Sequence, residues 1–220
     1  MSVATLVLPS LIQQQHFNDS RLDSASAIVP TYPKLSLGSC PKLTTDYDTF
    51  QRGNLLPEHP QVYWKIRQGV VRTNTWDIEG ALKTVGIWGA GDIVGAGLST
   101  LSPYQMECLS PVKIEPLTHL NDFAETLIHQ QQQTEALLNI ILVRHTQQRL
   151  LKLLDWLADR FGRDWGEGAR MIDIRLTHQH LADLAGTTRV TVTRLLNQLE
   201  HTHHIQRLPQ YRFVIYPSAR

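Results

Sequence analysis

Hydrophobic and polar positions follow three different patterns along the 220 residues of this chain. Residues 1–45 show no regular spacing, and Pro30, Pro33 and Pro41 interrupt any long element there. Residues 50–116 carry short runs of β-branched and aromatic residues separated by glycines, which predicts strands. From residue 120 onward, apolar residues recur at the three- and four-residue spacing of helices. We therefore expect an α+β protein in which the strands come first and most of the helices last.

The strand-rich segment predicts a compact antiparallel structure. Its most regular stretch, VYWKIRQGVVRTNTW at residues 62–76, is interrupted by Gly69, and six glycines fall from position 80 to position 97. Short strands that are about ten residues apart and separated by glycine turns are typical of a small barrel or sandwich.

The segment 120–143 contains neither proline nor glycine and predicts one long helix. An apolar stripe on such a helix needs a partner, which is either the neighbouring barrel or the same helix of a second chain. We favour contact with a second chain, because the pattern of the residues after 143 independently predicts a protein that acts as a dimer. The residues expected at this contact are Leu127, Thr134, Leu138 and Ile141.

The last third of the chain predicts helix, strand, helix, turn, helix and hairpin in that order. RLLKLLDWLADRFG at residues 149–162 is an amphipathic helix that Gly162 ends, and MIDIRL at residues 171–176 alternates like a strand. Residues 203–217 predict a hairpin with Pro209 and Gln210 at its turn.

LTHQHLADLAGTTRVTVTRLLNQLE at residues 176–200 fits the helix-turn-helix template. Thr177 and Thr188 stand at N-cap positions, and Gly186 supplies the left-handed backbone that ends the first helix. The second helix is expected to bury one stripe of apolar residues, namely Val192, Leu195, Leu196 and Leu199.

The opposite face of this second helix suits the major groove of DNA. Arginine can bind guanine O6 and N7 together, and an exposed apolar side chain can contact the thymine methyl group. Hydroxyl, amide and backbone N–H groups near helix N-termini bind phosphates. The expected DNA-binding residues are Arg189, Val190, Thr193, Arg194 and Asn197 on this face, with Thr177, His178, Gln179, Thr188 and Thr191 near the helix N-termini.

Residues 176–200 resemble the C-terminal domain of the CRP/FNR superfamily of bacterial transcription regulators. TRVTVTRLL is similar to the recognition helix of the cyanobacterial global nitrogen regulators. FQRGNLL, VYWKIRQGVVR, DIEG and GAGDIVGAGLS are similar, more loosely, to the β-roll sensor of the same family. The resemblance covers residues 50–217. It implies an N-terminal antiparallel β-roll (a cupin-like jelly roll) over residues 1–117, a dimerisation helix over 118–145 and a winged helix-turn-helix over 146–220.

The resemblance further implies a cytoplasmic homodimer on a palindromic double-stranded DNA site, with RNA polymerase as a further candidate partner. Arg189 and Arg194 then contact bases and phosphates. Val190 stands where cyclic-AMP-type members carry a glutamate that accepts from cytosine. A valine at this position favours the GTA/TAC half-sites of the nitrogen regulators.

The formal net charge of +1 combines an acidic and a basic part of the chain. Residues 144–220 hold 12 Lys/Arg against 7 Asp/Glu, whereas residues 1–143 hold 9 against 13. This asymmetry suits a sequence-specific regulator better than a non-specific architectural DNA-binding protein, which is the alternative. No run reaches 18 apolar residues and no signal-peptide pattern is present, so we expect neither a membrane span nor secretion.

The chain departs from the resemblance where an effector would bind. Cyclic-nucleotide members hold their ligand with an arginine and a glutamate, but Ala96 and Gly97 stand where the glutamate is expected. No arginine occurs between Arg72 and Arg144, although a buried anion needs a charged or multiply hydrogen-bonded partner. We therefore expect no cyclic nucleotide and leave the effector-binding residues unknown. The alternative is a regulator that senses 2-oxoglutarate or another small ligand in the β-roll.

An enzyme is the rival from a different class of protein. GIWGAGDIVGAG is glycine-rich but lacks the GK[ST] ending of a phosphate-binding loop, and no paired-carboxylate or Ser/His/Asp arrangement stands out. HTHH at residues 201–204 does not match the spacing of a structural zinc site. We expect no catalysis, no metal and no cofactor.

Overall fold

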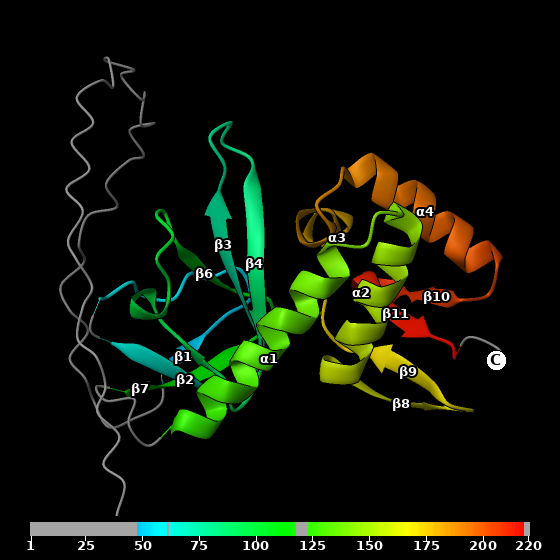
Figure 1. The fold of residues 1–220 in the computed structure, drawn as a ribbon. Coiled ribbons are helices and arrows are strands. Elements are labelled where there is room, and N and C mark those ends of the chain that lie inside the picture. Colours follow the sequence, from blue (N-terminus) through cyan, green and yellow to red (C-terminus); the bar gives the residue numbers. More distant parts are fainter. Residues whose placement is uncertain (1–47, 61, 118–122, 218–220) are drawn as a thin grey trace, which may run out of the picture. The chain divides into compact units, whose positions relative to one another are not determined.

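The N-terminal strands form two antiparallel sheets in the computed structural model, which describes residues 48–60, 62–117 and 123–217 (Figure 1). One sheet has the order β1-β7-β2-β5 and the other the order β4-β3-β6. The strands are β1 (Asp48–Phe50), β2 (Tyr63–Gln68), β3 (Val71–Trp76), β4 (Leu82–Trp88), β5 (Ile93–Val94), β6 (Gln105–Cys108) and β7 (Val112–Leu117).

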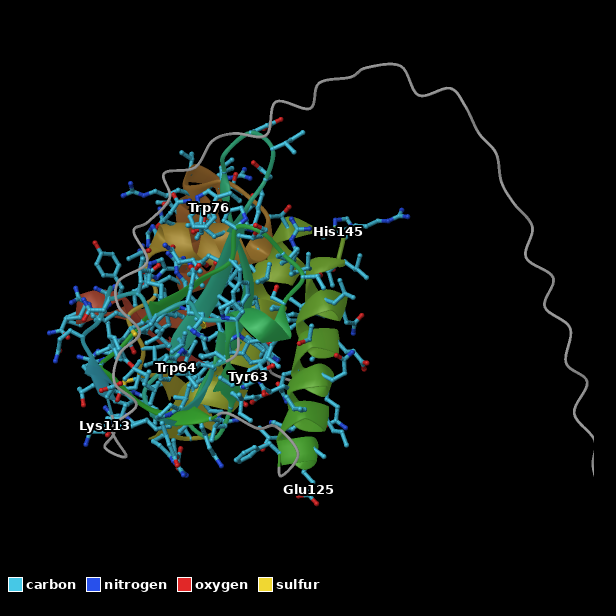
Figure 2. All side chains as sticks on the ribbon, turned by 90° about the vertical axis from the view of Figure 1, so that its left-hand side faces the viewer. Tyr63, Trp64, Trp76, Lys113, Glu125 and His145 are labelled. Atoms are coloured by element: carbon cyan, nitrogen blue, oxygen red, sulfur yellow. The ribbon has the colours of Figure 1, made fainter. Side chains whose placement is uncertain are left out.

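Alternation along these strands turns one face of each sheet towards a shared apolar core. Trp64 and Ile66 of β2 are fully buried and belong to the same cluster as Val71 of β3 and Met106 of β6. Trp64 lies inside this part of the molecule in Figure 2. Two sheets that share one core make a β-roll, so the expected fold class is confirmed.

Gly69 shows why the strand-rich segment needs its glycines. It joins β2 to β3 with a φ of 91°, which is a left-handed conformation that side chains rarely adopt. A Cβ atom built on it would lie 2.2 Å from the carbonyl oxygen of Pro111. Any larger residue at this turn would therefore push apart two adjoining loops of the roll.

Cys108 is buried in the core of the roll. Burial, with a smaller contribution from Glu107, raises the pKa of its thiol to about 11. The reactive thiolate is therefore not populated near neutral pH, which gives this cysteine a packing role. Cys40 lies outside the described residues.

The long helix α1 (Ala124–Ile141) lies within the predicted range of 120–143, of which residues 120–122 are outside the described part of the chain. Gln130, Leu137 and Ile140 form its buried face. In Figure 2, Glu125 lies in the first turn of this helix and His145 lies beyond its last residue, just before α2, and side chains project from the helix away from the sheets. Of the expected dimer residues, Leu127 and Ile141 are half-buried, whereas Thr134 and Leu138 are exposed.

The C-terminal part combines four antiparallel strands with three helices. Its sheet has the order β10-β11-β9-β8. The predicted hairpin is confirmed, with Pro209 and Gln210 in its turn. The elements are α2 (Thr146–Phe161), β8 (Gly162–Gly166), β9 (Ala169–Ile172), α3 (His178–Ala185), α4 (Arg189–His201), β10 (Ile205–Leu208) and β11 (Arg212–Ile215).

Two expectations for this part need correction. The strand predicted over residues 171–176 runs instead from Ala169 to Ile172, because its pairing with β11 ends at Ile172. Strand β8 was not predicted at all, since its sequence GRDWG has no alternation of apolar and polar residues. It forms by pairing with β9 and leaves four of its five residues exposed.

One continuous apolar core joins the C-terminal helices to α1 and to the roll. It contains Leu150, Leu154 and Leu157 of α2 together with Leu137 of α1 and Ile87 of β4. The described residues thus belong to one compact unit. None of their helices is long and apolar enough to span a bilayer.

Candidate nucleic-acid interface

Helix α3 is fixed at both ends by the residues that the sequence indicated. At its N-terminus, the Thr177 hydroxyl accepts from the backbone N–H of His180 at 3.1 Å, and the Thr177 N–H donates to Nδ1 of His180 at 3.4 Å. Burial and the nearby Arg72 and Arg52 lower the pKa of His180 to about 4, so the ring stays neutral and can accept this bond. At the other end Gly186 adopts the predicted left-handed conformation, with a φ of 58°.

Helix α4 begins after Thr188, whose hydroxyl accepts from the backbone N–H of Thr191 at 3.2 Å. The predicted apolar stripe is confirmed and packs into the core that α3 shares. Its members are Val192, Leu195, Leu196 and Leu199.

The opposite face of α4 is open. Val190 is 78% exposed, and Arg189, Arg194 and Asn197 are exposed around it. An apolar side chain held this far out of the core between two arginines has no packing function in the described chain. Its position suits contact with base edges, because a helix of this size fits the major groove.

Two of the expected DNA-binding residues have structural contacts within the domain. Nδ1 of His178 lies 2.8 Å from the hydroxyl of Thr193, which also donates to the carbonyl of Arg189 at 2.9 Å. Burial, Arg207 and Arg189 lower the pKa of His178, so a neutral ring that donates from Nδ1 is the consistent tautomer. The pair ties the start of α3 to the middle of α4, and a direct DNA contact by either residue stays a prediction.

The remaining expected residues lie at the helix N-termini. Gln179 is exposed, and its amide nitrogen donates to Asp183 at 2.7 Å, which leaves its carbonyl oxygen outside that bond. Thr188 and Thr191 hold each other through their hydroxyls at 2.9 Å. The backbone N–H of Thr191 is already donated to the Thr188 hydroxyl, so phosphate binding by these two residues at the start of α4 stays a prediction.

The tip of the wing between β10 and β11 was predicted as a turn, but its residues were not among the expected DNA-binding residues. Gln210 and Tyr211 both have positive φ values, 64° and 59°, and the Tyr211 ring is half exposed. Tyr211 stands edge-on to the ring of His178, 6.4 Å away, and Arg207 lines the same hollow of about 290 Å³. The sequence contains a signal for this candidate contact, because Arg207 precedes the predicted turn and Tyr211 directly follows it.

A second hollow, of about 430 Å³, lies between the roll and α1. We call it the sensor hollow. Every side chain that lines it is neutral. Its walls include Thr73, Trp88, Ile93 and Tyr104 of the roll and Leu127 and Gln130 of α1.

Gln130 acts as a bridge at the edge of the sensor hollow. Its amide nitrogen donates to the carbonyl of Ile93 at 2.8 Å, and its amide oxygen accepts from the N–H of Ile93 at 3.2 Å. Both polar ends of the side chain are therefore used to hold β5 against α1. Glu135, considered as an acidic partner for a ligand, is exposed and bonded to Gln131 at 3.2 Å.

Gly97, one of the two residues that stand where the glutamate of cyclic-nucleotide members is expected, has no room for a side chain. Ala96 and Gly97 lie in a short 3₁₀ turn. A Cβ atom on Gly97 would stand 2.7 Å from the carbonyl oxygen of Pro60 and 3.0 Å from the hydroxyl of Tyr63. A glutamate there would clash with the backbone.

Residues 148–216 match the family model of the Crp-like helix-turn-helix domain. Regulatory protein CysR of Synechococcus elongatus is 39% identical over 178 residues, which cover 77% of this chain and 86% of the relative. The global nitrogen regulator of Synechocystis sp. is 41% identical over 73 residues, or 33% of this chain and 32% of the relative.

Solved structures show the same fold at lower identity. TTHB099, a CRP-family transcriptional regulator from Thermus thermophilus, superposes with a TM-score of 0.66 at 19% identity, covering 77% of this chain and 92% of that one. TTHA1359, a CRP/FNR-family regulator from the same organism, gives a TM-score of 0.63 at 21% identity, covering 78% and 94%. Both similarities show that this chain shares the fold of these two proteins.

Proposed function

Because the chain belongs to the CRP/FNR family of transcription regulators, we propose that it binds a palindromic DNA site as a homodimer, with one α4 helix in each half-site. The open face of α4 carries this proposal, since Arg189, Val190 and Arg194 are exposed over a fully buried apolar stripe. In this proposal residues 1–117 are the sensor-like part, 118–145 the dimerisation helix and 146–220 the DNA-binding part.

The homodimer proposal is supported by apolar residues on the outer side of α1. Ile128, Leu138 and Leu142 are 60%, 55% and 69% exposed, whereas apolar side chains of the inner face are buried. A second α1 helix would cover them. Two recognition helices held this way would meet successive major grooves about one helical turn apart.

We expect selection from random DNA to enrich a palindrome with GTA/TAC half-sites. Val190 can contact a thymine methyl group but cannot accept a hydrogen bond from cytosine N4. The matched variant Val190→Glu should lose about tenfold or more in affinity for this site and shift its preference towards cytosine at the contacted position. Enrichment of a TGTGA-like half-site by the wild-type protein would contradict the proposal that Val190 contacts a thymine methyl group.

The same selection separates a specific regulator from an architectural protein. A specific regulator binds its site about 10³-fold or more above random duplex at physiological salt. An architectural protein binds both duplexes alike, with a steep dependence on salt. Equal affinities for the two would therefore overturn the proposed function.

We further propose that the regulator works without a cyclic nucleotide. A cyclic phosphate buried in the sensor hollow would need a cationic or multiply donating partner to offset its desolvation, and the lining is neutral. Arg72 precedes Thr73, which lines the hollow, but its guanidinium is bound to the carboxylates of Glu107 and Asp183. The same reasoning opposes 2-oxoglutarate, which carries two carboxylates.

Millimolar cyclic AMP, cyclic GMP or 2-oxoglutarate is therefore expected to leave the midpoint of thermal unfolding unchanged. A ligand at a hundred times its Kd would stabilise the folded state by about 2.7 kcal/mol, which is a shift of several degrees. Scanning calorimetry with and without each compound measures this. A reproducible rise of the unfolding midpoint by two degrees or more with any of these compounds would identify it as an effector and contradict this proposal.

A further inference from the structure

Two ion pairs cross from the roll to the C-terminal domain, and the first joins β3 to α3. The guanidinium of Arg72 donates to Glu107 within the roll, 2.8 Å from Nη2 and 3.0 Å from Nε. Its Nη1 atom reaches Asp183 on α3 at 3.3 Å. The side chains of Arg72 and Asp183 are only 8% and 7% exposed, so both charges are largely removed from water.

The second pair has the opposite polarity, with the arginine on the C-terminal domain and the carboxylate on the roll. Nη2 of Arg160 on α2 lies 2.6 Å from Oδ2 of Asp92, which also accepts from the backbone N–H of Gly89 at 2.8 Å. The guanidinium is held from the other side by the rings of Trp156 and Phe161, at 5.2 and 5.1 Å. Asp92 is 7% exposed.

Apolar contact accompanies these pairs but does not fix an orientation. Val70, Ile87 and Leu109 of the roll share a buried cluster with the leucines of α2. Burial of apolar surface is non-directional, so it resists separation of the two parts more than sliding or rotation. A buried charge is different, because moving it away from its partner leaves an uncompensated ion that costs several kcal/mol.

The two ion pairs leave the open face of α4 uncovered. Asp183 and Arg160 lie on α3 and α2, while Val190 on α4 is 78% exposed and its arginine neighbours are exposed too. The contact therefore orients α4 without covering it.

We propose that Arg72–Asp183 and Asp92–Arg160 are positioning pairs that hold each helix-turn-helix at one setting on the roll and thereby select the spacing between the two half-sites of the operator. The inference rests on the proposed function, since a spacing exists only for a dimer on a palindrome. Four residues that need not touch DNA then determine which palindromes are bound.

The test compares the full-length protein with its Asp92→Asn/Asp183→Asn double variant on palindromes of different spacer length. Both substitutions keep the size of the side chain and remove its charge. Inserting two base pairs turns one half-site by about 70° relative to the other. We expect this insertion to weaken the wild-type protein about 30-fold or more and the double variant less than about fivefold. Discrimination between bases within a half-site should stay the same in both, measured by fluorescence anisotropy.

Asp159→Asn is the matched control, because Asp159 is 70% exposed and pairs with Arg170 inside the C-terminal domain. It should keep the wild-type spacing preference. Should the double variant fail to fold, the single variants decide, since Asp183→Asn leaves Arg72 bound to Glu107. A folded variant with wild-type spacing preference overturns the inference, and so does a variant that binds the operator more tightly. Failure of the wild-type protein to prefer any palindrome would instead overturn the proposed function.

Discussion

Replacing Leu138 with glutamate is expected to convert the dimer into a monomer and to lower affinity for the palindromic site at least about 100-fold. Leu138 is 55% exposed on the outer side of α1. In a dimer the substitution would bury a carboxylate without a partner on both protomers, at a cost of several kcal/mol. The monomer would retain its fold, because the buried face of α1 is made by Gln130, Leu137 and Ile140. It would bind one half-site at a time and lose the gain from linked binding.

Sedimentation velocity gives the mass, and fluorescence anisotropy with the selected palindrome gives the affinity. His129→Glu is the matched control, since it places a carboxylate on the same helix about 180° round its axis from Leu138. His129 is exposed, so this variant should remain a dimer and bind normally. A Leu138→Glu protein that sediments as a dimer would show that Leu138 does not lie at the dimer contact.

The C-terminal domain could be predicted almost element by element from its sequence. Thr177, Gly186 and Thr188 act on their own helix ends, and their effect depends on neighbours within four residues. The apolar stripe of α4 likewise follows from helical spacing alone. Local causes of this kind are visible in a sequence.

Features that depend on distant residues could not be predicted. Strand β8 exists because β9 pairs with it, and GRDWG itself gives no periodic signal. Arg72 and Asp183 are 111 positions apart, and Gln130 meets Ile93 across 37 positions. The sequence shows that no arginine lies between Arg72 and Arg144. It could not show that Arg72 faces two carboxylates, because that follows only from how β3 and α3 pack.

The contacts between distant residues change how the absence of arginine between Arg72 and Arg144 is interpreted. The sensor hollow lacks cationic side chains, and Gln130 uses both ends of its amide to join β5 to α1. Asp92, the residue before Ile93, holds Arg160 of the DNA-binding domain. The roll, the long helix and the DNA-binding domain are thus connected by side chains of the protein itself.

Replacing Arg189 or Arg194 with alanine is expected to cost about 1–3 kcal/mol in binding to the selected site, or about 5- to 150-fold in affinity. Both side chains project from the open face of α4. Truncating them leaves the buried stripe of that helix intact, so the free energy of unfolding should change by less than about 0.5 kcal/mol. The loss is therefore a loss of DNA contacts.

Affinities for the selected palindrome and for random duplex, measured at one fixed salt concentration, separate the two kinds of contact. An arginine that binds a base lowers affinity for the palindrome more than for random duplex, whereas one that binds a phosphate lowers both alike. Arg163→Ala is the matched control, because Arg163 on β8 is 58% exposed in its side chain and carries the same charge. It should leave discrimination between the duplexes unchanged. If Arg189→Ala and Arg194→Ala bind both duplexes with wild-type affinity, α4 is not the helix that meets DNA, and the wing around Tyr211 becomes the surface to vary next.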